Sequence, residues 1–242
     1  MSTVVRAATY NIQHGAIADF DWAALMQPVN SVRAALVGVQ EVDMHTKRSH
    51  GLDSTEGIRL ALGWPEGRFI PSMPYSGGLY GNAVFSALPL EAFEVAALVN
   101  RPGQEPRSCG HAVLRMDNGK RLHFLTAHLA YENAASRKPQ FEQLRAILDA
   151  IPGDEAFILT GDFNTEREEE FLPLFNGRAA LANTLSEERS ASDPHYRTFP
   201  GTGHAIDNLV YDVRNLKMTA VGMKLDCLSD HNMLWAEFAY RD

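Results

Sequence analysis

Polar side chains able to bind a metal ion or transfer a proton follow several apolar runs of this sequence. In FILTGDFNTE, residues 157–166, Asp162 and Asn164 stand two positions apart after a strand-like stretch. Side chains alternate along an extended chain, so these two would point the same way. The pattern recurs after other apolar stretches and gives the set Asn11, Glu41, His128, Asp162, Asn164, Asp207, Asp230 and His231.

This set combines carboxylates, amides and imidazoles, which together suit metal-assisted hydrolysis. Hard oxygen ligands favour Mg²⁺ or Mn²⁺, and imidazoles can move protons or stabilise charge near neutral pH. Taken singly, each residue also fits an Asx turn, a helix cap or a core histidine. Repetition at strand ends favours one shared site, although spacing alone does not bring the ends together.

The elements that would position these residues are mainly strands. Period-two and continuous apolar patterns predict strands at Val4–Tyr10, Leu36–Gln40, Ala83–Ser86, His111–Met116, Leu122–Ala127, Ala156–Thr160, Ala205–Tyr211 and Met233–Phe238. A helix is predicted at Ala134–Ala150, and a less regular one begins near Asp21 and is disturbed at Pro28.

The order of these elements predicts a single domain, residues 1–242, with mixed sheets. The turn at 117–119 leaves no room for a crossover helix, so its flanking strands form a hairpin. Hairpins combined with strand-helix-strand units indicate a mixed sheet or two packed sheets with outer helices. Segments 46–57 and 71–81 are predicted to be loops bordering the site.

Composition excludes several classes of protein. The formal net charge of -8 disfavours non-specific binding to nucleic acid. Cys109 and Cys227 have no CxxC spacing, which argues against a disulfide framework and a thiolate metal site. The sequence has neither a membrane-spanning apolar stretch nor a secretory pattern. We therefore expect a cytoplasmic, monomeric protein without stable membrane association.

The ordered series YNIQ, VQEVD, GNAVFSALP, TAHL, GDFNTE, IDNLVY and SDHNML, within residues 5–239, resembles the metal-dependent endonuclease/exonuclease/phosphatase superfamily. Each motif is short, but their joint order and strand contexts carry the resemblance. It implies an α/β (α+β) four-layer sandwich of two packed mixed β-sheets flanked by helices, with the site at one edge.

The resemblance also implies a metal group. Glu41 resembles the principal Mg²⁺ ligand, with Asn11 close by and Asp230 near the metal or its water shell. Mn²⁺ is a candidate substitute for Mg²⁺. Magnesium is therefore the expected cofactor.

The remaining residues resemble the family's catalytic group. Asp162 matches the carboxylate that orients or activates the attacking water, and Asn164 would donate to a phosphate oxygen. His231 resembles the histidine beside the scissile phosphate, with Asp207 holding its ring, and His128 would contact another phosphate oxygen. Whether Asp162 or His231 is the general base stays open at this point.

Three arginine and glutamine positions have weaker assignments. Arg107, in EPRSCGHAVL, matches a family arginine that could contact phosphate, although an ion-pair role fits equally well. Arg137 and Gln140 match the family pattern before its long helix and are interpreted as structural.

We expect a Mg²⁺-dependent phosphohydrolase that cleaves a phosphodiester or phosphomonoester by in-line attack of water. A small phosphorylated substrate is preferred to DNA or RNA because of the acidic charge, and a nuclease is the alternative. Asp43 and Gln13 replace residues usual in AP endonucleases, which disfavours abasic-site cleavage. The segment Pro71–Tyr80 could face a membrane, but substrate-loop or packing roles are preferred. A non-catalytic phosphate-binding protein would show gaps in the residue set, and this chain shows none.

Overall fold

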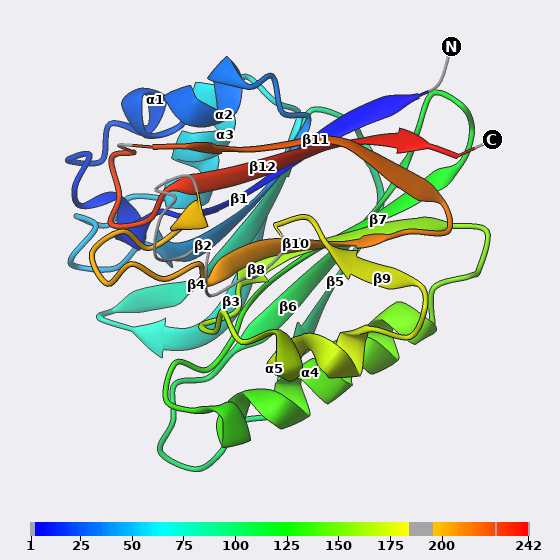
Figure 1. Cartoon of the computed structure of the whole chain (residues 1–242). Helices are drawn as coiled ribbons and strands as arrows, with labels where there is room; N and C mark the ends of the chain where they lie inside the picture. The colour runs from blue at the N-terminus through cyan, green and yellow to red at the C-terminus, as the bar shows by residue number, and fades with distance from the viewer. Residues whose placement is uncertain (1–2, 184–195, 226, 242) are drawn as a thin grey trace.

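The computed structural model describes residues 3–183, 196–225 and 227–241 as two packed six-stranded sheets (Figure 1). Sheet A has the order β11 (Leu216–Lys224), β12 (Met233–Tyr240), β1 (Val4–Asn11), β2 (Leu36–Met44), β4 (Gly78–Ser86), β3 (Glu66–Tyr75). Sheet B has the order β5 (Leu90–Ala97), β6 (Ser108–Arg115), β7 (Arg121–His128), β8 (Ala156–Asp162), β10 (Asp207–Asp212), β9 (Ala179–Leu181). Each sheet is mixed, because β1–β2 and β7–β8 pair in parallel among antiparallel neighbours.

Helices cover the outer faces of both sheets and complete the four layers (Figure 1). On sheet A lie α1 (Trp22–Leu25), α2 (Gln27–Ser31) and α3 (Ser54–Leu62). On sheet B lie α4 (Ala134–Asp149) and α5 (Glu168–Phe171). Short 3₁₀ turns occupy Gln13–Gly15 (η1) and Leu172–Leu174 (η2). Within the described residues, no helix is long and apolar enough to cross a membrane.

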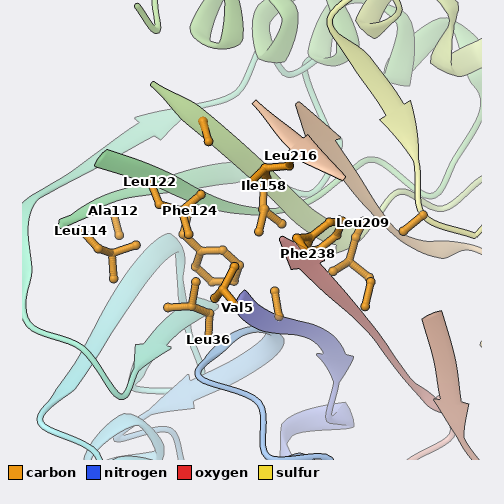
Figure 2. Close-up of a cluster of buried hydrophobic side chains, with 14 of the residues drawn as sticks. Val5, Leu36, Ala112, Leu114, Leu122, Phe124, Ile158, Leu209, Leu216 and Phe238 are labelled. Carbon is orange, nitrogen blue, oxygen red and sulfur yellow. The ribbon is translucent and has the colours of Figure 1, made fainter. Parts of the chain in front are cut away.

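Apolar packing holds the layers together on three levels. Between the sheets, Phe124 and Ile158 of sheet B pack with Leu36 and Phe238 of sheet A (Figure 2). Two further clusters fill the spaces between each sheet and its helices. Central strands are therefore buried on both faces, which explains their continuous apolar sequences.

The expected four-layer fold is confirmed, as are the predicted strands, the hairpin at 117–119 and the helix at 134–150. Cys109 and Cys227 are not joined in a disulfide, and of the two expected core thiols Cys109 is buried and Cys227 is partly buried. The helix expected from Asp21 exists as two short pieces whose junction is Met26. Pro28 does not cause this interruption of the helix. It lies in the first turn of α2, where its missing N–H costs no hydrogen bond.

The two predicted loops were wrong in part. Segment 71–81 forms the turn and the adjoining halves of β3 and β4, with Ser76 and Gly77 both at positive φ in the turn. Prolines at positions 71 and 74 are tolerated because β3 is an edge strand. Segment 46–57 contains the start of α3, whose N-cap Asp53 accepts the Glu56 N–H at 2.9 Å.

Candidate active site

Three neighbouring strands of sheet B place polar residues at one register level. Asp162 ends β8, and its partners across the ladders are His128 at the end of β7 and Asp207 at the start of β10. All three side chains are buried. Strand register therefore builds a row of one imidazole and two carboxylates.

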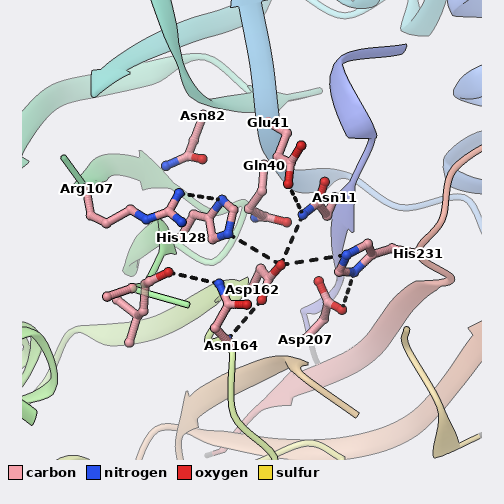
Figure 3. Close-up of polar contacts among 12 residues, drawn as sticks. Asn11, Gln40, Glu41, Asn82, Arg107, His128, Asp162, Asn164, Asp207 and His231 are labelled. Carbon is pink, nitrogen blue, oxygen red and sulfur yellow. Dashed lines mark hydrogen bonds and ion pairs between the residues drawn. The ribbon is translucent and has the colours of Figure 1, made fainter. Parts of the chain in front are cut away.

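Sheet A brings a third carboxylate, that of Glu41, toward this row by an irregularity in β2. The β2–β4 register shifts between Val39 and Val42, so Gln40 and Glu41 together oppose Asn82. Glu41 has a φ of 59°, which non-glycine residues rarely adopt. Such bulges re-aim side chains and occur beside functional sites. This one turns Glu41 toward Asn11 (Figure 3).

Asn11 joins the two sheets at the site. Its Nδ2 donates to Glu41 Oε1 at 3.1 Å and to Asp162 Oδ2 at 3.0 Å (Figure 3). Its Oδ1 accepts the backbone N–H of Gln13 at 3.1 Å. An amide N–H₂ between two carboxylates reduces their repulsion and fixes their positions.

The segment before β12 supplies Asp230 and His231. Gln13 Nε2 donates to Asp230 Oδ2 at 3.0 Å, and Ser229 Oγ donates to the Asn11 carbonyl at 2.8 Å. These contacts fasten the segment to the end of β1. Asp230 thus joins the group through Gln13, and its charge contributes to raising the pKa of Glu41.

His231 is paired with Asp207 and faces Asp162. Its Nδ1 lies 2.8 Å from Asp207 Oδ2, and its Nε2 lies 3.8 Å from Asp162 Oδ2. Burial by itself would lower the pKa of His231, but the carboxylates of Asp207, Asp162 and Asp230 outweigh it and raise the pKa to about 10. The ring of Phe199 lies 4.7 Å from that of His231, between centroids. His231 is therefore a buried cation at neutral pH.

His128 is a neutral imidazole with a defined tautomer. Arg107 Nη1 lies 3.2 Å from His128 Nδ1, and because a guanidinium can only donate, Nδ1 must accept. The proton then sits on Nε2, which lies 3.5 Å from Asp162 Oδ2. Burial, together with the charges of Arg107 and His231, lowers the pKa of His128 well below its ordinary value.

Asp162 is the centre of this arrangement. One of its oxygens faces Asn11, His128 and His231, and the other accepts the Asn164 backbone N–H at 2.9 Å. Burial raises the pKa of Asp162 well above its usual range, and Asp207 raises it further. The Asn164 side chain donates one hydrogen to the Leu129 carbonyl at 2.9 Å, which leaves its second N–H for a ligand.

The donor set around Glu41 fits a hard divalent cation. Within residues 3–183, 196–225 and 227–241, Glu41 forms no ion pair with a lysine or arginine, and burial raises the pKa of its carboxyl. A partly buried carboxylate beside another acid is costly without a cation. Asn11 presents its nitrogen to Glu41, so in this arrangement it orients the carboxylates rather than offering its oxygen.

A second group in the described residues also meets the distance requirement for a cation. Candidate ligand atoms of Asp162, Asp207 and His231 lie within 4.8 Å of one another. Two of these three groups, Asp207 and His231, already pair with each other at 2.8 Å, whereas Glu41 has no lysine or arginine partner among the described residues. This difference favours Glu41 as the metal position.

Comparison with known proteins places this site in a family. The sequence model of the Endonuclease/Exonuclease/phosphatase family matches residues 8–231. The chain belongs to this family. Nucleases and phosphatases both hydrolyse phosphoester bonds, so the expectation of a hydrolase acting on ester bonds is confirmed at that level.

Individual proteins resemble this chain in sequence or in fold. The chain is 27% identical over 179 residues to the uncharacterized protein YbhP of Escherichia coli (strain K12), covering 70% of each. It shares its fold with the human Nocturnin catalytic domain, at a TM-score of 0.77 and 21% identity, over 99% of this chain and 94% of that one. It also shares its fold with the mannosyl-6-phosphatase Bt3783 of Bacteroides thetaiotaomicron, at a TM-score of 0.75 and 16% identity, over 97% and 99% of the two chains.

Sequence reasoning missed several residues that support the site. Gln13 holds Asp230, Asn82 faces the bulge, and Tyr80 is a buried residue whose hydroxyl pKa, raised by burial, also responds to the charge of Glu41. Gln13 follows the predicted strand Val4–Tyr10 and Asn82 directly precedes the predicted strand Ala83–Ser86, and a polar residue next to a strand is the one signal that could have found them. Tyr80 carries no such signal, because it lies in a segment predicted to be a loop.

Arg137 and Gln140 have structural contacts, as interpreted. Arg137 binds the carboxylate of Glu170 at 2.7 and 3.0 Å and donates to the Ala130 carbonyl at 3.1 Å. Gln140 accepts the Ala130 N–H at 2.9 Å. Together they fix the loop that follows His128.

Proposed function

We propose that this protein is a Mg²⁺-dependent phosphohydrolase that cleaves a phosphodiester or phosphomonoester by in-line attack of water. The observation that carries the proposal is the position of Asp162. Its carboxylate is held by the Asn11 amide between a neutral imidazole, His128, and a charged one, His231. This arrangement combines a proton acceptor with donors for phosphate oxygens.

Glu41 and Asp230 would hold the metal, with Asn11 orienting Glu41. When bound, Mg²⁺ would neutralise charge on phosphate oxygens. Gln13 is a positioning residue for Asp230 through its 3.0 Å hydrogen bond. Mn²⁺ offers the same preference for oxygen ligands and is the expected substitute.

Asp162 is proposed as the general base. A base works best with a pKa near the operating pH, and burial raises the pKa of Asp162 toward that range. His231 is unsuited to this role because its raised pKa keeps it protonated. It would instead stabilise negative charge on the phosphoryl group, and Asp207 would keep it charged.

The remaining polar groups are proposed to contact the other phosphate oxygens. The free N–H of Asn164 and the Nε2–H of His128 are available for this purpose. Arg107 lies behind His128, paired with Glu105 at 2.7 Å, and fixes its tautomer. A direct phosphate contact by Arg107 remains part of the proposal.

A small phosphorylated molecule is proposed as the substrate, ahead of DNA or RNA, because the formal net charge of -8 opposes a polyanion. A cytoplasmic location, a monomeric state and a single domain over residues 1–242 also remain predictions. Gel filtration with light scattering tests the second of these.

The first experiment measures hydrolysis of p-nitrophenyl phosphate, bis-p-nitrophenyl phosphate and plasmid DNA with Mg²⁺, Mn²⁺ or EDTA. Asp162→Asn should abolish turnover, whereas Asp117→Asn, in an exposed hairpin turn, should not change it. Faster cleavage of plasmid than of either small ester would favour the nuclease alternative.

A direct metal measurement separates an inactive protein from a poor choice of substrate. Calorimetry with Mg²⁺ should show binding to the wild type and loss of binding in Glu41→Gln. Metal binding without turnover on any ester would indicate a phosphate-binding protein that does not catalyse. Equal binding by wild type and Glu41→Gln would overturn the metal assignment.

A further inference from the structure

The segment after β2 holds one arginine rigidly at the edge of the sandwich. Arg48 donates from Nε and Nη2 to the two oxygens of Asp43, at 2.7 and 2.9 Å. Its guanidinium lies 4.5 Å from the ring centroid of Tyr75 and 5.5 Å from that of Tyr80. Thr46 adds a third contact, donating to Asp43 at 2.7 Å. Arg48 is thus preorganised by a planar pairing and two aromatic rings.

This arginine is connected to the candidate active site by a single tyrosine. Asp43 and Tyr80 are cross-strand partners in β2 and β4, two residues beyond Glu41 and Asn82 respectively. The ring of Tyr80 faces Arg48, and burial raises the pKa of its hydroxyl, on which the charges of Glu41 and Arg107 also act. Tyr80 therefore lies between Arg48 and the charged groups of the candidate active site, where Arg107 Nη1 is 3.2 Å from His128 Nδ1.

The contacts of Arg48 leave part of its hydrogen-bonding capacity unused. A guanidinium has five N–H donors, and the pairing with Asp43 occupies one on Nε and one on Nη2. Within the described part of the chain, Nη1 donates to no acceptor, and the Arg48 side chain is 31% exposed. Asp43, in contrast, is fully buried.

Neutralising a buried aspartate would by itself explain the pairing, but not the rest of the geometry. To neutralise Asp43, the side chain at position 48 needs only a positive charge and does not need exposed N–H donors. Here Nη1 has no acceptor among the residues that the structure describes, and the guanidinium lies over the ring of Tyr75, which is itself 39% exposed. Fixed, partly exposed arginine donors are suited to phosphate recognition.

We propose that Arg48 binds a second phosphate of the substrate, a few bonds away from the phosphate that is cleaved. The inference rests on the proposed phosphohydrolase function and narrows its substrate to esters with two phosphate groups. The scissile phosphate would lie among Asp162, His128 and His231. The second would lie on the Arg48 side of Tyr80 and accept hydrogen bonds from Nη1.

A pair of substrates that differ by one phosphate tests this assignment. Thymidine 5′-(p-nitrophenyl phosphate) has only the scissile phosphate, and its 3′-phosphorylated form adds a second. A charge-assisted hydrogen bond corresponds to about a 10- to 100-fold effect. Wild-type protein should therefore prefer the bisphosphate by about that factor in kcat/KM, and Arg48→Gln should bring the ratio near one.

The matched control is Lys47→Gln, which removes an exposed positive charge from the adjacent position. Lys47→Gln should leave the preference for the bisphosphate ester unchanged. If it lowered this preference as much as Arg48→Gln does, the preference would come from general electrostatic attraction and not from a contact with Arg48. Arg48→Gln leaves Asp43 buried without its cation and could unfold the segment. The double variant Asp43→Asn/Arg48→Gln removes both charges together and should show the same loss of preference.

Failure of this inference can be distinguished from failure of the proposed function. If wild type hydrolyses neither thymidine ester and none of the three substrates named under the proposed function, the phosphohydrolase proposal fails. Calorimetry with thymidine 3′,5′-bisphosphate and thymidine 5′-monophosphate then tests Arg48 alone. A wild-type ratio near one, or a ratio that Arg48→Gln does not change in either assay, overturns the second-phosphate assignment. A substrate extended by one nucleotide at the 3′-phosphate identifies the kind of molecule that supplies the second phosphate. A further rise in rate would indicate a nucleic acid, and an unchanged rate would indicate a small bisphosphate.

Discussion

Replacing Asp207 by Asn tests whether the carboxylate of Asp207 keeps His231 protonated. The substitution keeps the size of the side chain and an acceptor for His231 Nδ1, now 2.8 Å from Asp207 Oδ2, but removes the charge. The rise in the pKa of His231 from 6.5 to about 10 corresponds to about 5 kcal/mol at 1.36 kcal/mol per pH unit. A hydrogen bond to a charged group contributes about 1.5 to 3 kcal/mol of such an effect. The pKa should therefore fall by about one to two pH units in Asp207→Asn, with Asp162 and Asp230 supplying the remainder.

The assay is an NMR titration of the histidine ring signals in metal-free protein, with His231 assigned by its loss in His231→Gln. Because the folded-state pKa lies above the unfolded value, protonation of His231 stabilises the fold fully below pH 6.5. That stabilisation is lost as the pH rises through about 10. The stability difference between wild type and Asp207→Asn should accordingly shrink over this range.

Activity provides an independent measurement of the same effect. If charged His231 is required, the alkaline limb of the kcat/KM profile should move to lower pH in Asp207→Asn, and the rate should fall on the order of 10²-fold or more. A wild-type His231 that titrates near 6.5 would refute the reasoning. So would an unchanged pKa in the variant.

Three further predictions concern stability. Gly38→Ala should lower the free energy of unfolding by about 1 to 3 kcal/mol in urea, because its Cβ would meet two threonine hydroxyls of sheet B, whereas Gly153→Ala, in open space, should be tolerated. Burial and a neighbouring histidine lower the pKa of His111 to about 4, so stability should decline as the pH falls from about 6.5 to 4, and His111→Gln should flatten that decline. Arg137→Gln should cost about 1.5 to 3 kcal/mol because it removes charge-assisted hydrogen bonds to the partly buried carboxylate of Glu170, against less than about 1 kcal/mol for Lys138→Gln at an exposed pair.

The sequence was sufficient to predict the inner strands because burial on both faces leaves a continuous apolar pattern. The strands it missed are β3, β5 and β11, each at a sheet edge, and the short β9. In β5 most side chains are exposed or partly exposed, so no core-facing pattern appears. β3 contains two prolines, which the pattern treats as breaks although an edge strand accepts them.

At the site, the types of residue could be predicted from the sequence, but the orientation of their side chains could not. Glu41 faces Asn11 only because β2 contains a bulge with a left-handed residue, a feature without a sequence signature when the residue is not glycine. The partnership of Asp230 with Gln13 spans 217 positions and depends on the 3₁₀ turn after β1. Both are consequences of tertiary packing.

The packing of apolar neighbours decides where the polar residues point. In the segment GDFN, Phe163 is fully buried and its ring lies 5.9 Å from that of Phe141 and 5.1 Å from that of Phe171, between centroids. Moving β8 by one residue would expel this ring from its cluster and turn Asp162 away from His128 and Asp207. The register that buries Phe163 is therefore the register that assembles the carboxylate row. Selection for a stable core and selection for the site act on the same alignment of strands, which is why an acid and an amide can flank a phenylalanine at this point of the chain.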